Sequence, residues 1–135
     1  MIYQTEIELR GRSRGFHLIT QDIESALKLP EKGLLNLFIR HSSAGLSINE
    51  NADPSVRVDF ETVFNKLIPE NDSDYVHVME GSDDMPAHIK SSLTGVSLMI
   101  PIVNFRLGLG IWQGIYLCEF RNEGGPRRII ATIYS

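Results

Sequence analysis

Acidic residues and a histidine are crowded into one short stretch, "EGSDDMPAHIKSSL", at residues 80–93. Three carboxylates, the last two being Asp83 and Asp84, precede Pro86. Proline suits the first turn of a helix because it has no N–H to leave unpaired there. Asp84 can then accept hydrogen bonds from the free amides at the start of that helix. The stretch fits two interpretations: an aspartate-capped helix that carries a surface histidine, His88, or part of a polar reactive site.

Three of the four histidines, His41, His77 and His88, have polar or acidic neighbours in the sequence. Three neutral imidazoles that leave one coordination position open form the type of site that binds a catalytic divalent metal ion. Their spacing matches neither H-E-x-x-H nor a CxxC pair, so the pattern indicates a candidate metal site without specifying it. His17 has no polar company in its strand-like run, and we interpret it as structural.

A polar segment, "HSSAGLSINENADP", follows at residues 41–54. Its side chains, among them Ser43, Asn49 and Glu50, are of the types that bind a substrate or orient a metal ligand. Ser, Asn and Asp are also common in turns and helix caps for purely local reasons. Both interpretations remain open from the residues alone.

A glycine-rich segment, "NFRLGLGIWQGIYLCEFR", spans residues 104–121. Its glycines are spaced G-x-G-x-x-x-G and precede a strand-like run rather than a helix, so the segment fails the test for a dinucleotide-binding loop. Trp112 and Gln113 are placed to contact a ligand or to close the core. Cys118 is interpreted as a small buried side chain rather than a nucleophile.

The elements that must position these residues are mostly strands. Alternation of apolar and polar residues in "IYQTEIELR" (2–10) predicts a half-buried strand. The loop "NEGGP" is predicted to join the last two strands as a hairpin. Further strands are predicted at 15–20, 34–41, 74–80, 96–103, 114–121 and 127–135, and helices at 20–29, 53–67 and 85–93.

The helices have recognisable ends. Thr20 is expected to cap the first helix, Asp53 the second, and Gly95 to end the third. Strands outnumber helices and do not alternate regularly with them, which favours an α+β fold. The fold class is therefore α+β, with an antiparallel β-sandwich-like core and about three flanking helices.

The whole chain has 135 residues, and we expect a single domain, residues 1–135. A formal charge of −4 argues against general affinity for nucleic acid or for a membrane surface. One cysteine excludes an internal disulfide, and the charged beginning of the chain does not match a signal peptide. These features predict a cytoplasmic protein.

The three polar segments, in this order, resemble the YjbQ-like family, which is often described as secondary thiamine-phosphate synthase. The matching motifs are "HSSAGLSINENADPSVRVD", "EGSDDMPAHIKSSLTG" and "LGIWQGIYLCEFR". The resemblance covers nearly the whole chain, and the second motif is highly specific. One departure is Ile111, where the family usually has threonine before the Trp-Gln pair, which removes a hydroxyl group.

The resemblance implies a homotrimer of β-sandwich-like subunits and a polar cavity built from motif positions. In this chain the implied metal ligands are His41, His77 and His88, with a divalent zinc, manganese or magnesium ion. The implied catalytic carboxylates are Asp84 and Glu50. The implied substrate-binding side chains are Ser43, Asn49 and Gln113.

The activity that the resemblance implies is thiamine phosphate formation, in which a pyrimidine diphosphate is joined to a thiazole phosphate. That reaction needs a cation to stabilise the departing pyrophosphate and a site that excludes water. The expected partner is thus a small phosphorylated substrate. The alternative is a non-catalytic metal- or ligand-binding trimer whose synthase activity is incidental.

Overall fold

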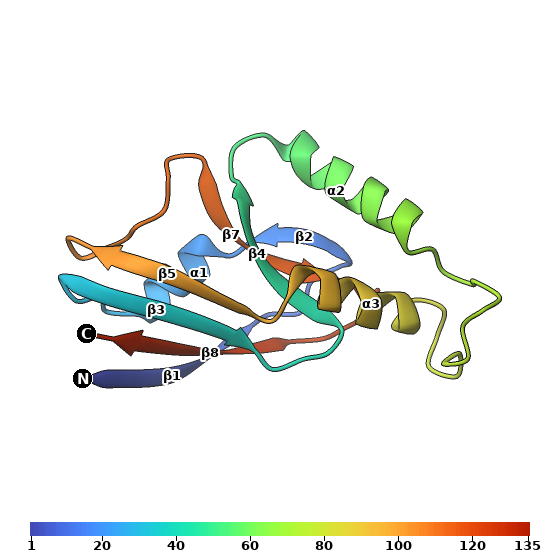
Figure 1. Ribbon diagram of the computed structural model, residues 1–135, viewed down its shortest axis with the longest axis horizontal. Coiled ribbons are helices and arrows are strands. Elements are labelled where there is room, and N and C mark those ends of the chain that lie inside the picture. The colour runs from blue at the N-terminus through green and yellow to red at the C-terminus, as the bar shows by residue number, and fades with distance from the viewer.

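The computed structural model covers residues 1–135 and arranges them in three layers: a large sheet, a small sheet and a pair of helices (Figure 1). The two ends of the chain lie side by side at the edge of the large sheet, where the Met1 amino group donates to the Ser135 carbonyl. The large sheet contains, in spatial order, β1 (Ile2–Leu9), β8 (Arg127–Tyr134), β3 (Lys32–Ile39), β5 (Ser97–Val103) and β6 (Arg106–Leu107). The small sheet contains β2 (Gly15–Leu18), β7 (Gln113–Glu119) and β4 (Ala44–Glu50).

The main core lies between the two sheets, and every strand pair in both sheets is antiparallel. Alternate residues of each strand point inward, because successive side chains of a strand face opposite sides. Together with α1 (Thr20–Ala26), these strands bury a cluster of 16 apolar residues. The predicted α+β fold with a sandwich-like antiparallel core is confirmed.

The two longer helices, α2 (Pro54–Leu67) and α3 (Asp84–Thr94), lie on the other side of the small sheet (Figure 1). Beneath them is a second buried cluster formed by Phe16, Ala87, Tyr116, Cys118 and Phe120. Gly45 on β4 allows α3 to approach closely, because a Cβ atom there would collide with the Thr94 side chain. The metal-ligand candidates of α3 are thereby held against the end of the small sheet.

Of the three residues predicted to begin or end a helix, two do so in the structure. Asp53 caps α2 by accepting a hydrogen bond from the Ser55 amide at 2.9 Å, and Pro54 is in the first turn. Gly95 ends α3 with a φ angle of 93°, a conformation that glycine adopts easily. The predicted Thr20 cap is wrong, because its hydroxyl accepts from the Ile115 amide at 2.9 Å and ties α1 to β7 instead.

Residues 74–80 do not form the predicted strand. Val76 and Val78, whose alternation suggested a half-buried strand, are 95 % and 59 % exposed. No neighbouring strand is available to pair with this segment, which lies in the long connection between α2 and α3 at the edge of the molecule (Figure 1). The segment instead brings His77 to α3.

The hairpin predicted across "NEGGP" is also wrong. β7 pairs with β2 and β4 in the small sheet, whereas β8 pairs with β1 and β3 in the large sheet. The loop therefore crosses from one sheet to the other. An ion pair between Glu119 and Arg127 closes the crossing, with Arg127 Nε donating to Glu119 Oε1 at 2.7 Å.

The face of the large sheet that points away from the core carries large apolar side chains. Those between 43 % and 63 % exposed are Ile2, Leu34, Phe38, Met99, Val103 and Tyr134. The register places Ile2 opposite Tyr134, and Tyr134 opposite Leu34, so three of them form a continuous row.

No helix in the structure combines the length and the hydropathy needed to cross a membrane.

Candidate metal centre

His77, Asp84 and His88 meet at the N-terminal end of α3. Asp84 and His88 are four residues apart on the helix and therefore share one face. His77 reaches the same carboxylate from the connection before the helix. The Nε2 atoms of His77 and His88 lie 2.7 Å and 3.1 Å from one and the same oxygen, Asp84 Oδ2.

Asp84 is the buried centre of this cluster, with a side chain that is only 2 % exposed. Its second oxygen, Oδ1, accepts a hydrogen bond from the Arg121 guanidinium. Burial raises the pKa of Asp84, but the hydrogen bond with His77 and the charge of Arg121 outweigh that effect. The pKa therefore lies below the ordinary value, and the carboxylate is ionised at neutral pH.

Arg121 holds the turn that leads into α3. Its Nε atom donates to Asp83 Oδ2 at 2.9 Å, and its Nη2 atom donates to the Glu80 carbonyl at 3.1 Å. The Asn122 amide also donates to Asp83 Oδ2, at 2.9 Å. The acidic residues of this turn thus neutralise one arginine. The residue at the N-cap position of α3 is Asp83 rather than Asp84, and its side chain forms no capping hydrogen bond.

The orientation of the His88 ring determines where its proton lies. Nδ1 is 2.9 Å from the Ser42 carbonyl oxygen, which can only accept a hydrogen bond, so Nδ1 carries a proton. The lone pair of the neutral ring is then on Nε2 and points at Asp84 Oδ2. A backbone carbonyl on the far ring nitrogen is the usual orienting partner of a histidine that binds metal.

The three atoms fit the donor set of a divalent cation. They lie within 4.8 Å of one another, and the imidazoles of His77 and His88 are 43 % and 32 % exposed, so an ion has access from solvent. Bonds of about 2.0–2.2 Å from zinc to nitrogen and oxygen place adjacent ligand atoms roughly 3–3.5 Å apart. To bind an ion, His88 Nε2 and Asp84 Oδ2 need to move little, because they are already 3.1 Å apart. His77 Nε2 and Asp84 Oδ2, at 2.7 Å, must separate slightly.

Cavities border the cluster on both sides. One of about 270 Å³ is lined by His41, Ser42, His88, Ser91, Ser92 and Val96. A smaller one, of about 120 Å³, lies on the His77 side and includes Tyr75, Ser82 and Met85 in its lining. The first has room for a phosphate-sized group beside His88.

His41 lines the larger cavity with His88 but lies outside the three-residue cluster. Its Nε2 atom accepts a hydrogen bond from the Arg128 amide at 2.9 Å, and its Nδ1 atom is 3.3 Å from Arg127 Nη1. Burial, followed by the charge of Arg127, lowers the pKa of His41, which favours the neutral ring. Asp84 is the third donor of the cluster, and the role of His41 as a metal ligand stays a prediction.

Beside His41 lies an ion pair that reasoning from the sequence missed. Arg127 and Glu119 are 5 % and 0 % exposed, and Arg127 also donates to the Ser43 hydroxyl at 3.0 Å. The sequence held a signal for this pair. Glu119 and Arg127 are an even number of residues away from inward-facing residues of their strands, Ile115 on β7 and Ile129 on β8, and so lie on the same strand face as those residues. Ser43, predicted to bind substrate, is thus engaged with a buried guanidinium.

The remaining predicted site residues, Asn49, Glu50 and Gln113, lie together at the other end of the small sheet. Glu50 and Gln113 are register partners on β4 and β7. From Ala44 to Glu50 the strand extends roughly 20 Å at about 3.3 Å per residue. Within one chain the structure does not bring this group to His77, Asp84 and His88.

Each side chain of this second group has a local partner. The Glu50 carboxylate accepts from the Ala52 and Asp53 amides at 3.0–3.2 Å, as expected of a turn-stabilising residue. Gln113 Oε1 accepts from the Gly110 amide at 2.8 Å. Asn49 Oδ1 accepts from the Glu50 amide at 2.7 Å, which leaves the amide nitrogen of Asn49 free.

Comparison with known proteins agrees with the motifs. The family model described as "UPF0047 protein YjbQ-like" matches residues 5–135. The UPF0047 protein YjbQ of Salmonella typhimurium is 55 % identical over 98 % of each chain, and the UPF0047 protein YugU of Bacillus subtilis is 42 % identical over 81 % of this chain and 80 % of its own.

Solved structures show the same architecture. A conserved hypothetical protein of Thermus thermophilus superposes with a TM-score of 0.83 at 36 % identity, covering 95 % of this chain and 97 % of its own. A YjbQ/UPF0047 family protein of Clostridium acetobutylicum superposes with a TM-score of 0.82 at 36 % identity, covering 96 % of this chain and 99 % of its own. The chain therefore belongs to the UPF0047 (YjbQ-like) family.

Proposed function

We propose that this protein is a metal-dependent enzyme that holds a divalent cation on His77 Nε2, His88 Nε2 and Asp84 Oδ2. The cation is zinc, manganese or magnesium, and the mixed nitrogen and oxygen donor set favours zinc or manganese over magnesium. Three protein ligands leave a coordination position for substrate, as in catalytic rather than structural sites.

The observation that carries the proposal is the contact between His88 Nε2 and Asp84 Oδ2. The Ser42 carbonyl fixes the proton of the neutral ring on Nδ1, so a lone pair of the ring faces an ionised carboxylate at 3.1 Å. Two lone pairs at that distance repel each other unless a cation lies between them. A proton or a divalent metal ion fills that role, and His77 supplies a second nitrogen to the same position.

The proposed reaction joins a pyrimidine diphosphate to a thiazole phosphate with release of pyrophosphate, as the family resemblance implies. When bound, the cation supplies positive charge to the departing pyrophosphate. The larger cavity beside His88 supplies the space for that group. Arg121 keeps Asp84 ionised and oriented, and His41, held neutral beside Arg127, contacts the substrate from the opposite wall of the cavity.

The proposal includes a homotrimer. The row of exposed apolar side chains on the outer face of the large sheet supports burial against another copy, because monomeric proteins rarely leave such a face uncovered. Assembly also offers a route by which Glu50, Asn49 and Gln113 of one copy act at the metal centre of another. Light scattering is expected to give about three times the chain mass of 15.2 kDa, and a concentration-independent monomer contradicts this part.

Metal binding is tested on tag-free protein by competition with a chromophoric zinc chelator. Replacing His77 or His88 with alanine is expected to weaken zinc binding by about 10- to 100-fold or more, because each removes a donor. His17→Ala is the matched control, since the only hydrogen-bond partner of that ring is the Ser13 carbonyl, at 2.7 Å. Undiminished binding in the His77→Ala and His88→Ala double variant contradicts the site. Loss of zinc binding in His41→Ala instead assigns the ion to the three histidines His41, His77 and His88.

Catalysis is tested separately, by measuring pyrophosphate release from the two substrates with each metal supplied. Activity that is lost in His88→Ala but retained in His17→Ala supports the enzyme. Metal binding without turnover under any metal favours the alternative, a non-catalytic metal- or ligand-binding trimer.

A further inference from the structure

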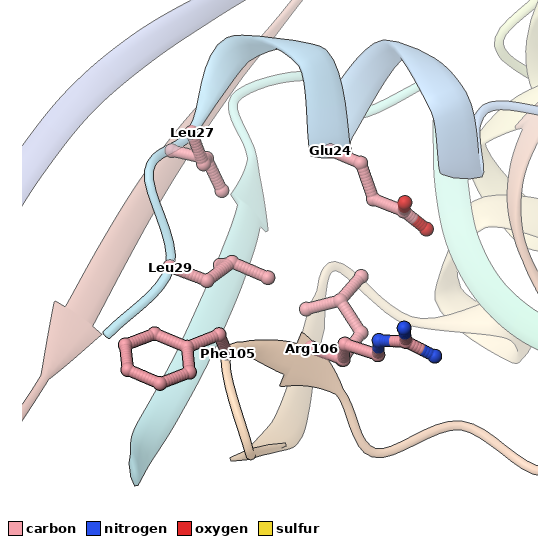
Figure 2. Close-up of a pocket in the computed structure, with 6 residues that line it drawn as sticks. Glu24, Leu27, Leu29, Phe105 and Arg106 are labelled. Carbon is pink, nitrogen blue, oxygen red and sulfur yellow. The ribbon is translucent and has the colours of Figure 1, made fainter. Parts of the chain in front are cut away.

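The largest cavity of the molecule is remote from the metal centre. It has a volume of about 460 Å³ and lies between the end of α1 and the β5–β6 hairpin, on the edge of the large sheet (Figure 2). It shares no lining residue with the cavities beside His77 and His88. The residues that line it are Glu24, Leu27, Leu29, Phe105, Arg106 and Leu107.

Two opposite charges face this cavity without meeting. Figure 2 shows the Glu24 carboxylate extending into it from α1 and the Arg106 guanidinium extending into it from β6. They form no ion pair with each other, and neither charged group forms a hydrogen bond to another side chain. Both charges therefore remain available to a ligand.

An apolar wall connects the two charges. Leu27, Leu29 and Leu107 are partly buried and pack against the main core, so their positions are held by the fold. Figure 2 shows the Leu27 and Leu29 side chains directed toward the space between the charges. The cavity is thus apolar along one side and carries a negative and a positive group at separate points.

Phe105 stands at the rim in an unfavourable backbone conformation. Asn104 and Phe105 have φ angles of 52° and 65°, the pattern of a tight hairpin turn in which glycine is preferred at the second position. A bulky residue there costs of order 1–3 kcal/mol. The phenyl ring is 64 % exposed, so burial in the core does not offset this strain.

From this arrangement we propose that the cavity binds a small zwitterion whose ammonium and carboxylate groups lie at opposite ends of an apolar body, as in a dipeptide of apolar amino acids. The ammonium group pairs with Glu24, and the carboxylate takes two parallel hydrogen bonds from Arg106. The apolar side chains lie on the leucine wall, and Phe105 covers the exposed side. The volume is within the range of about 300–1,000 Å³ that is usual for small-molecule sites.

The volume of the cavity favours a dipeptide over a single amino acid. At about 460 Å³ it exceeds what one apolar amino acid fills, so a second residue is needed to cover the leucine wall between the two charges. This inference is independent of the proposed metal chemistry.

The test is a titration of the full chain with leucyl-leucine, followed by calorimetry and by NMR shifts of the residues around the cavity. Saturable binding is expected, weakened about threefold to tenfold by Glu24→Gln and by Arg106→Gln, since each removes a partly solvent-screened charge contact. Dipeptides with an acetylated amine or an amidated carboxylate are expected to lose the same factor, and leucine alone to bind more weakly. His77→Ala, at the metal centre, is the control and is expected to bind the dipeptide normally.

Phe105→Gly separates binding from folding. This variant is expected to melt at a higher temperature, because glycine relieves the strained turn, and yet to bind the dipeptide less tightly. The proposal is overturned if leucyl-leucine does not bind saturably to the wild type, or if Glu24→Gln and Arg106→Gln bind it as tightly as the wild type. It is also overturned if these variants change the assembly state in light scattering, because the cavity is then covered by another copy of the chain.

Discussion

Asp84 on α3 and Glu119 on β7 are both almost fully buried carboxylates that contact an arginine. Glu119 has both oxygens occupied by donors: Arg127 donates to each of them, and the Arg121 amide donates to Oε2 at 3.2 Å. Asp84 has a donor on Oδ1 only, the Arg121 guanidinium, while its Oδ2 faces two imidazole nitrogens. The two sites share burial and charge but differ in what the second oxygen meets.

That difference separates a structural carboxylate from one suited to bind a cation. Every neighbour of the Glu119 oxygens is an obligate donor, so the pair is complete and has no room for an ion. The imidazole nitrogens beside Asp84 Oδ2 either donate a proton or offer a lone pair, depending on what lies between them and the carboxylate. Replacing an acid by its amide measures this difference directly, because it exchanges one acceptor oxygen for a donor.

The largest effect is expected from Glu119→Gln. The new amide places N–H donors against the Arg127 guanidinium or the Arg121 amide, and it leaves a buried guanidinium without a counter-charge. Breaking a buried ion pair in this way costs about 3–5 kcal/mol of the free energy of unfolding. Chemical denaturation followed by fluorescence is the measurement, and a loss below about 1 kcal/mol contradicts the assignment of Glu119 as a saturated structural carboxylate.

An intermediate effect is expected from Asp83→Asn, about 1–2 kcal/mol, because both of its hydrogen bonds go to a single oxygen that an amide can retain. Burial raises the pKa of Asp83, but bonds from the Asn122 amide and from Arg121 lower it below its ordinary value of 3.8. Ionised Asp83 therefore stabilises the fold above pH 3.8, and this contribution is lost as the pH falls through the folded-state pKa. The difference in melting temperature between wild type and variant should close in acid, and a difference that persists there contradicts this account.

The fold could be predicted where side-chain alternation reflects a sheet with one face in the core. β1 follows that pattern and was predicted from it, and the strand-like runs that form β3, β5 and β8 were predicted as well. The same alternation in residues 74–80 gave a false strand, because alternation shows only that a segment can pair and not that a partner strand is present. Likewise, the turn residues of "NEGGP" indicate a change of direction but do not reveal that the chain passes to the other sheet.

The candidate site was predictable in part for the same reason. Asp84 and His88 are four residues apart in a recognisable helix, so their proximity follows from helical geometry. His77 joins them from an irregular connection whose path depends on tertiary contacts, and Arg121 comes from the end of β7. Sequence motifs also grouped Glu50 and Gln113 with the histidines, whereas within one chain the length of β4 holds them apart.

The smallest effect on stability is expected from Asp84→Asn. The amide oxygen can still accept from Arg121, and the amide N–H groups can donate to the ring nitrogens of His77 and His88. Each buried polar atom therefore keeps a partner, and the cost should be about 1 kcal/mol or less despite burial as deep as that of Glu119.

Metal binding should show the reverse order. Asp84→Asn removes the only anionic ligand and occupies the ion position with an N–H group, so the affinity for zinc should fall about 100-fold or more. Asp83→Asn serves as the matched control, because it alters the adjacent carboxylate and the same arginine but no donor atom of the cluster. Chelator competition and thermal melting are measured on the same samples of wild type and both variants. Zinc affinity lost at an unchanged melting temperature places the cation on Asp84 Oδ2, whereas equal affinity in all three proteins reduces the imidazole–carboxylate contact to a structural hydrogen bond.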